Sequence, residues 1–137
     1  MEVGAYLFFN GRCDEAIDFY KKALDAELQF LMRYSEMPEP APPGMLPAGF
    51  EDKVTHATLR FGKTEVMVSD GNSDTPKDFR GFTLSIAADD ITQATRFFNA
   101  LAEEGHVKMP LSKTFWSPGF GMVEDKFGVG WMVSISD

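Results

Sequence analysis

The segment Ala16-Ile17-Asp18-Phe19-Tyr20 returns later in the chain as Ala94-Thr95-Arg96-Phe97-Phe98. Two shorter matches follow in the same order: Phe61-Gly62 returns as Phe127-Gly128, and Met67-Val68-Ser69 returns as Met132-Val133-Ser134. Because self-similarity that keeps its order along the chain is typical of a repeated structural unit, the sequence predicts two copies of one module. Each copy joins a helix to strands that follow glycine turns.

The first copy of the repeat centres on a helix expected at residues 12–24. Its apolar residues recur at helical spacing, and its acidic residues precede its basic ones, which suits the helix dipole. Apolar runs and runs of alternating apolar and polar residues predict strands around this helix. These strands are expected at residues 3–9, 27–34, 55–61 and 65–69.

The second half of the chain repeats this order. Asp90 with Gln93 resembles a capping box, and the helix that starts there is expected to end at Gly105. Strand-like segments lie at residues 82–87, 107–109, 114–116, 120–124 and 131–135. The predicted fold class is α+β, with tandem β-α-β-β-β modules that form a curved mixed sheet cup.

A chain of 137 residues is expected to be a single domain, because smaller pieces could not hold a core unaided. Within it, module one covers about residues 1–70, a polar linker about 71–79 and module two about 80–137. Five of the eight prolines fall in residues 36–49, which predicts a loop because proline lacks the N–H donor of a strand. A loop of this length is either a lid or binding loop or a solvated excursion.

The composition excludes several classes of partner. Acidic residues outnumber basic ones by 21 to 13, so the net charge of −8 repels phosphate, and neither nucleic acid nor an anionic membrane is an expected partner. No apolar run reaches the length of a membrane span, and no basic signal segment begins the chain. Cys13 is the only cysteine and cannot pair within the chain. We therefore expect a cytoplasmic protein.

Short motifs along nearly the whole chain carry a family resemblance. They lie at residues 6–13, 15–16, 19–20, 56–57, 67–70, 109–111, 114–116, 125–129 and 131–132. With the tandem β-α-β-β-β order, they resemble the PhnB-like branch of the vicinal oxygen chelate superfamily, which includes glyoxalase I, extradiol dioxygenases and bleomycin-resistance proteins. One departure is Asp25, which stands where the family has a glycine after the first helix. Aspartate tolerates the left-handed conformation better than most residues, so this change should cost little.

The resemblance also implies where a metal ion would bind. Metal-dependent members place His, Glu or Gln ligands on facing strands, two in each module, and the last ligand ends a segment of the form D-P-x-G-x-x-x-E. Met132 stands at that last place, and Met67 takes the matching place in module one. The remaining places fall near Ala5 or Tyr6 and near Phe82 or Thr83. Since hard divalent cations favour oxygen or imidazole ligands, we expect no metal ion and no cofactor.

Three side chains remain as candidates for chemistry. His56 is interpreted either as a hydrogen-bonded structural residue or as a general base or ligand-binding group, with Ser69, Asp70 or Glu65 beside it. Ser69 lacks the G-x-S-x-G context of a hydrolase nucleophile. Cys13 belongs to a helical stripe, which favours a packed side chain over a reactive thiolate.

Methionine and aromatic residues take the place of the metal ligands, and they form either plain core or the wall of a site for a flat, hydrophobic ligand. The predicted pocket residues are Tyr6, His56, Met67, Ser69, Thr83, Phe115, Trp116 and Met132. No residue is assigned a catalytic role.

The expected function is binding of a small organic molecule in an apolar cup, without metal, and the resemblance implies a homodimer. The alternative is an enzyme of the superfamily (a lyase, isomerase or dioxygenase) that uses His56 and a nearby carboxylate or an unrecognised metal site. A methyltransferase is not expected, because no glycine-rich loop follows a strand. A phosphonate-related role lacks a basic cluster, since Arg12, Arg60 and Arg96 are scattered.

Overall fold

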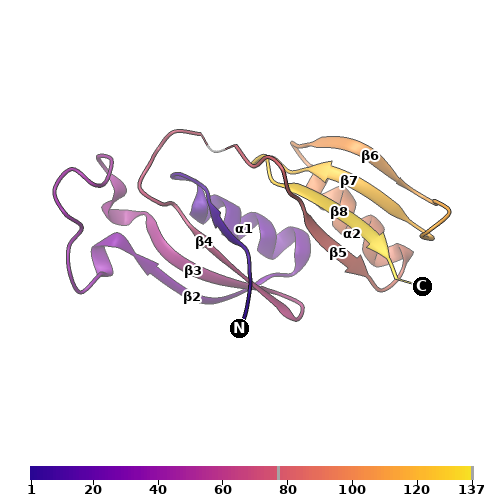
Figure 1. The fold of residues 1–137 in the computed structure, drawn as a ribbon, viewed down its shortest axis with the longest axis horizontal. Helices are drawn as coiled ribbons and strands as arrows, with labels where there is room; N and C mark the ends of the chain where they lie inside the picture. The colour runs from indigo at the N-terminus through magenta and orange to yellow at the C-terminus, as the bar shows by residue number, and fades with distance from the viewer. Residues whose placement is uncertain (77, 137) are drawn as a thin grey trace. The chain divides into compact units, whose positions relative to one another are not determined.

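The computed structural model describes residues 1–76 and 78–136. The chain divides into two compact units, Met1–Lys77 (unit 1) and Asp78–Asp137 (unit 2). Among the described residues, each unit contains one α-helix and one four-stranded mixed sheet, with the strands and α-helix in the order β-α-β-β-β (Figure 1). The predicted fold class is therefore confirmed, with one sheet in each module.

Unit 1 contains the strands in the spatial order β1-β4-β3-β2, with β1 parallel to β4 and the other neighbours antiparallel. Its elements are β1 (Tyr6–Phe8), α1 (Cys13–Leu24), β2 (Glu27–Arg33), β3 (Val54–Phe61) and β4 (Thr64–Ser69). The first strand is shorter than the predicted 3–9, because only its last part pairs with β4. The other boundaries agree with the prediction to within one residue.

Helix α1 buries one stripe of side chains, which includes Ala16, Ile17 and Tyr20, against the sheet of unit 1. The sheet contributes its own buried face, with Leu59 and Val68 fully or almost fully buried. The helix ends at Asp25, whose φ of 56° and ψ of 32° are left-handed. This confirms that aspartate adopts the conformation that glycine usually supplies after a helix.

The Asp70 carboxylate holds three parts of unit 1 together. It is fully buried, and its Oδ1 accepts hydrogen bonds from the backbone N–H of Gly11 and of Cys13, both at 2.8 Å. Its Oδ2 accepts from the Val54 N–H at 2.9 Å. One side chain after β4 therefore pairs donors at the start of α1 and at the start of β3.

The proline-rich segment is a loop, as predicted. It is flanked by two short 3₁₀ helices, η1 (Tyr34–Glu36) and η2 (Phe50–Asp52). The Tyr34 N–H donates to the Lys53 carbonyl at 3.0 Å, and the rings of Tyr34 and Phe50 lie 6.4 Å apart. The two ends of the loop are thus held side by side, so the loop leaves and rejoins the unit at one place.

Unit 2 repeats the topology, with the spatial order β5-β8-β7-β6 and β5 parallel to β8. Its elements are β5 (Leu84–Ala88), α2 (Ile91–Ala102), β6 (His106–Ser112), β7 (Phe120–Glu124) and β8 (Gly130–Ile135). The predicted cap at Asp90 is present, since its Oδ1 accepts from the Gln93 N–H at 2.8 Å. The helix ends at Ala102, earlier than the predicted Gly105.

The strand predicted at residues 114–116 is wrong. The Thr114 N–H donates to the Ser117 carbonyl at 3.0 Å, and the Ser117 N–H donates to Thr114 Oγ1 at 3.1 Å, which closes a turn. The buried Ser117 hydroxyl then bonds to the carbonyls of Gly119 and Ile135. The aromatic residues that resemble a strand in the sequence therefore lie in a loop between β6 and β7.

Candidate functional site

The side chains of the unit 1 sheet alternate between the face covered by α1 and an opposite face, which we call the open face of unit 1. The strand register defines it by three sets of neighbours. One row contains Tyr6, Met67, Thr58 and Phe30, and another contains Glu65, Arg60 and Glu27; the third set contains the pairs Phe8–Ser69 and His56–Met32. Four of the predicted pocket residues thus share this face: Tyr6, His56 and Met67, and the buried Ser69.

Aromatic rings gather on the open face of unit 1. Tyr6 stacks on Phe8 with 4.9 Å between ring centroids, and both residues are 38% exposed. The imidazole of His56 lies 5.6 Å from the Tyr6 ring and 5.9 Å from the Phe30 ring. Since these rings come from β1, β3 and β2, they form an apolar surface that crosses the sheet.

Both ring nitrogens of His56 have hydroxyl partners. Its Nδ1 lies 2.9 Å from Tyr6 Oη, and its Nε2 lies 3.4 Å from Thr58 Oγ1. Burial raises the pKa of the Tyr6 phenol, and a hydrogen bond with the Ser69 hydroxyl opposes this rise. The phenol therefore stays protonated in its pair with the imidazole.

The expected carboxylate beside His56 is absent from the hydrogen bonds of residues 1–76 and 78–136. Asp70 is engaged by three backbone donors, because its carboxylate closes the turn before α1. Ser69 is also structural, since its hydroxyl accepts from the Gly71 N–H at 2.8 Å and is buried. The geometry thus gives His56 a phenol as its nearest partner.

Charge on the open face of unit 1 gathers at one end. Arg60 forms an ion pair with Glu27 across β3 and β2, and the register places Glu65 of β4 opposite Arg60 on its other side. The single guanidinium therefore lies between two carboxylates. Together these three side chains carry one net negative charge.

The corresponding face of unit 2 is built from smaller and more flexible side chains. Met132 pairs in register with Ser85 on one side and with Met122 on the other, and Met122 pairs with Met109. Ser85 thus takes the place that Tyr6 takes beside Met67. Thr83 was expected there, but it precedes β5 and lies against Gly130, where an added Cβ would come within 3.1 Å of Thr83 Cγ2.

The remaining predicted pocket residues, Phe115 and Trp116, lie in the loop between β6 and β7. Phe115 is 97% exposed and meets Trp116 edge-on, with 4.7 Å between ring centroids. Trp116 also meets Phe120 edge-on at 5.5 Å. The structure brings together the predicted residues of unit 1, and within unit 2 it places Phe115 and Trp116 in an aromatic cluster with Phe120.

The side chains at the metal-ligand places that the resemblance implies do not suit a divalent cation. In unit 1 these places hold Tyr6 and Met67. In unit 2 one holds Met132, and the register places Ser85, rather than the expected Phe82 or Thr83, beside it. A thioether is a poor ligand for hard cations. In addition, no group of three or more His, Cys, Asp or Glu that could hold a metal ion occurs among the described residues.

Cys13 is packed inside unit 1. It is completely buried, and burial together with the nearby Asp70 carboxylate raises the pKa of its thiol well above the ordinary value. This confirms the interpretation of Cys13 as a core side chain.

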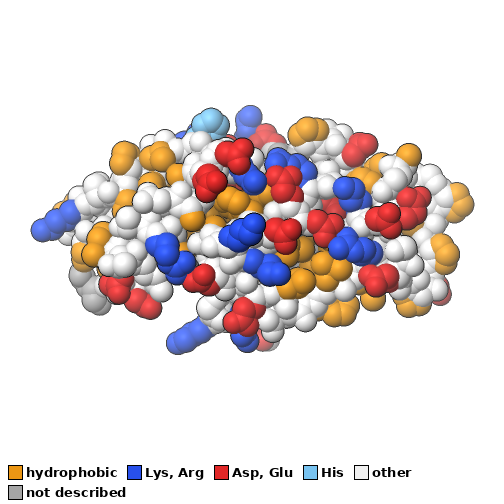
Figure 2. Space-filling model, turned by 180° about the vertical axis from the view of Figure 1, so that it is seen from behind, with side chains coloured by type: hydrophobic (Ala, Val, Ile, Leu, Met, Phe, Trp, Pro, Cys, Tyr) orange, Lys and Arg blue, Asp and Glu red, His pale blue; other side chains and the backbone are white. Residues whose placement is uncertain are grey.

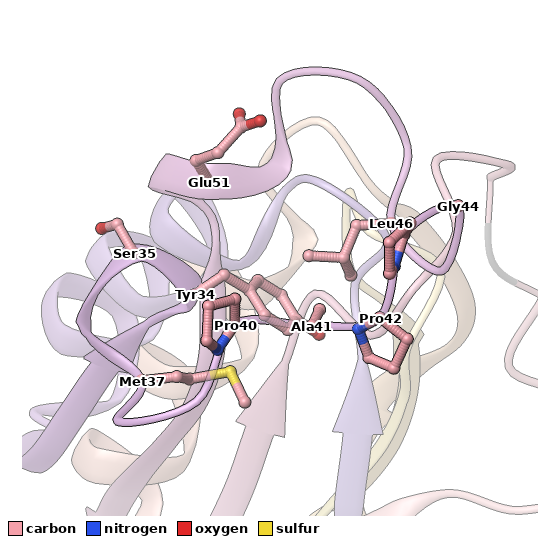
Figure 3. A pocket seen from close by; sticks show the side chains of 10 residues that line it. Tyr34, Ser35, Met37, Pro40, Ala41, Pro42, Gly44, Leu46 and Glu51 are labelled. Carbon is pink, nitrogen blue, oxygen red and sulfur yellow. The ribbon is translucent and has the colours of Figure 1, made fainter.

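A pocket of about 350 Å³ lies within the proline-rich loop of unit 1 (Figure 3). Its lining residues are Tyr34, Ser35, Met37, Pro40, Ala41, Pro42, Pro43, Gly44, Leu46 and Glu51. The walls come from the loop and from the two 3₁₀ helices that flank it. The loop therefore encloses space of its own, separate from the residues of the open face of unit 1.

The surface shows no broad basic area on the face drawn in Figure 2, where Lys and Arg side chains are interspersed with Asp and Glu. None of the helices among residues 1–76 and 78–136 is long and apolar enough to cross a membrane.

Comparison with known proteins places these features in a family. The model of the Glyoxalase/Bleomycin resistance protein/Dioxygenase superfamily matches residues 3–133. Protein YjdN of Escherichia coli (strain K12) is 35% identical over 140 residues, which cover 98% of this chain and 95% of that protein.

Two solved structures have the same fold over their whole lengths. The crystal structure of protein PA1353 from Pseudomonas aeruginosa is 39% identical, with a TM-score of 0.85 over 99% of this chain and 98% of that chain. A Bacillus cereus structure described as a putative 3-demethylubiquinone-9 3-methyltransferase, PhnB protein, is 27% identical, with a TM-score of 0.81 over 99% and 100% of the two chains.

Proposed function

Since this chain belongs to the PhnB-like branch of the Glyoxalase/Bleomycin resistance protein/Dioxygenase superfamily, we propose that it binds a small organic molecule without using a metal ion. The observation that carries the proposal is the open face of unit 1. There, the partly exposed rings of Tyr6 and Phe30 lie beside a hydrogen-bonded His56, and the partly exposed ring of Phe8 stacks on Tyr6.

The chemistry of this face favours an apolar, flat ligand. A ring laid on it buries apolar surface at about 25 cal/mol per Å², and stacking or edge-on contacts between aromatic rings add about 0.5–1.5 kcal/mol each. Met32 and Met67 lie beside the rings in the sheet register, and the flexible thioether chain adapts to different ligand outlines. Tyr6 and Met67, which stand at the metal-ligand places of unit 1, thus belong to the surface that supports ligand binding.

Binding is tested with Nile red, a neutral apolar dye whose emission rises in an apolar site. Phe30→Ser removes a ring that is 48% exposed on the open face of unit 1, and the control Ile91→Ser removes a side chain that is 55% exposed on α2. We expect Phe30→Ser to weaken dye binding at least severalfold, whereas Ile91→Ser leaves it unchanged. Equal binding by wild type and Phe30→Ser, or no binding by wild type, contradicts the proposal.

Independence from metal is tested by melting EDTA-treated protein alone and with Mg²⁺, Mn²⁺, Fe²⁺, Ni²⁺ or Zn²⁺. A metal present at 100 times its dissociation constant would add about 2.7 kcal/mol and raise the melting temperature by roughly 5–10 °C. We expect no such rise with any of the five ions. A rise with one of them contradicts the metal-free proposal and favours the metal-dependent enzyme.

A further inference from the structure

The Tyr6–His56 pair adds a polar group to an otherwise apolar surface. Tyr6 Oη is held 2.9 Å from His56 Nδ1, and the Tyr6 side chain is partly exposed. A phenol oxygen has one donor and two acceptor positions, so its hydrogen bonds to the imidazole and to the Ser69 hydroxyl leave one position at the same oxygen. That position lies beside the rings that would hold a ligand.

The pair accommodates either direction of the hydrogen bond. If the phenol donates to Nδ1, its oxygen accepts from a ligand; if Nδ1–H donates to the phenol, the phenol O–H turns to a ligand. A ligand hydroxyl matches both arrangements, because a hydroxyl both donates and accepts. A ligand without a hydrogen-bonding group would cover the phenol oxygen and leave its remaining hydrogen-bonding position without a partner, which costs binding energy.

The charged side chains on the open face of unit 1 disfavour an acidic ligand. The guanidinium that the described residues place on the open face of unit 1, on Arg60, lies between Glu27 and Glu65, so an anion there would share it with two carboxylates. A carboxylate or phosphonate on the ligand would lose its hydration and meet these two negative charges. The ligand that fits is therefore uncharged.

Size follows from the spacing of the rings. The His56 imidazole lies 5.6 Å from the Tyr6 ring and 5.9 Å from the Phe30 ring, measured between centroids. The Tyr6 and Phe30 rings are therefore no more than about 11.5 Å apart. A fused pair of aromatic rings laid over the imidazole would cover more of this surface than a single ring.

From these observations, and resting on the proposed function, we infer that the ligand is a neutral, hydroxylated aromatic molecule whose hydroxyl group bonds to Tyr6 Oη. Tyr6 is then the residue that selects for the hydroxyl group. Phe8 and Phe30 contact the aromatic body of the ligand and form no hydrogen bond with its hydroxyl group.

The test compares 2-naphthol, 2-methylnaphthalene and 2-naphthoate as calorimetric probes at neutral pH. The first two have nearly the same shape and differ in the hydroxyl group, and the third adds a negative charge. The measured quantity is the ratio of the affinities for 2-naphthol and 2-methylnaphthalene. Tyr6→Phe keeps the ring and removes the hydroxyl, and Tyr20→Phe, at a buried position of α1, is the matched control.

We expect the ratio to fall roughly three- to tenfold in Tyr6→Phe, as loss of one neutral hydrogen bond predicts, and to stay constant in Tyr20→Phe. We also expect 2-naphthoate to bind more weakly than 2-naphthol. An unchanged ratio in Tyr6→Phe, an equal fall in both variants, or tighter binding of 2-naphthoate overturns the inference and leaves the proposed function standing. Failure of all three probes to bind overturns both.

Discussion

Asp70 offers the sharpest test of how unit 1 is held together, through the substitution Asp70→Asn. An asparagine whose oxygen takes the place of Oδ1 keeps the bonds from Gly11 and Cys13, but its amide NH₂ then faces the Val54 N–H. One buried donor is left unpaired, which costs about 1–3 kcal/mol. The two bonds that remain lose the contribution of the charge, about 1 kcal/mol each.

A neutral amide is easier to bury than a carboxylate, which offsets part of this loss. We therefore expect Asp70→Asn to lower the free energy of unfolding by about 3 kcal/mol. The assay is urea unfolding followed by far-ultraviolet circular dichroism, in which such a loss moves the midpoint by more than about 1 M. The control is Asp74→Asn, which makes the same chemical change at an exposed position and should cost less than about 0.5 kcal/mol. If the two variants unfold at the same midpoint, the role assigned to the Asp70 carboxylate is refuted.

Three further substitutions test other parts of the fold. Asp25→Gly should stabilise the protein by up to about 1 kcal/mol in the same urea assay, because glycine adopts the left-handed conformation at no steric cost. A loss of stability in this variant would contradict the role of backbone conformation at Asp25. Cys13 should not react with a thiol reagent until the protein is unfolded. Because burial raises the pKa of this thiol in the folded state, the free energy of unfolding should fall as the pH rises above the ordinary thiol pKa of about 8.5, at up to about 1.4 kcal/mol per pH unit. The substitution Cys13→Ala should make this pH dependence weaker. Equal slopes for wild type and variant would show that the thiol is not the cause. Gly105→Ala should cost more than about 2 kcal/mol, because its Cβ would collide with the Glu124 carbonyl oxygen, whereas Gly4→Ala, with open space around it, should stay within about 0.5 kcal/mol; similar midpoints for the two would contradict this packing.

The repeated module could be predicted from the sequence because its signals are local. Met67-Val68-Ser69 and Met132-Val133-Ser134 each carry the alternation of a strand, and the structure places both at the same position of their sheets, opposite Tyr6 and Ser85. The residues at 114–116 also have the composition of a strand, but the Ser117 hydroxyl and backbone turn the chain there. A turn that one serine stabilises has no repeating pattern of apolar and polar residues, so the sequence does not reveal it.

The site could be predicted only in part, because it depends on which strands become neighbours. Tyr6 and His56 are far apart in the chain and meet only because β4 lies between β1 and β3. Phe8 and Phe30 were missed as candidates, since a phenylalanine in a strand is usually part of the core, and only the register places them on the open face of unit 1. The signal that could have found Phe8 is its alternation with Leu7 beside Tyr6.

The expected partner of His56 illustrates a second limit of sequence reasoning. Asp70 follows the strand that carries Ser69, so a carboxylate beside the imidazole was a reasonable hypothesis. In the structure, the backbone N–H groups of Gly11 and Cys13 before and at the start of α1, and of Val54 at the start of β3, donate to its carboxylate. A sequence does not show which backbone N–H groups will lie near a side chain. Here these groups bind the Asp70 carboxylate, and Asp70 therefore stabilises the fold.

The central claim is that a small organic molecule binds on the open face of unit 1, and the methionines of this chain provide a direct test. In protein labelled with ¹³C at the methionine methyl groups, each of the eight methionines is a separate reporter in a two-dimensional NMR spectrum. Titration with 2-naphthol should shift the signals of Met67 and Met32, which lie on that face, and leave those of Met1 and Met45 in place. A titration in which Met67 and Met32 do not move while the probe binds would contradict the account.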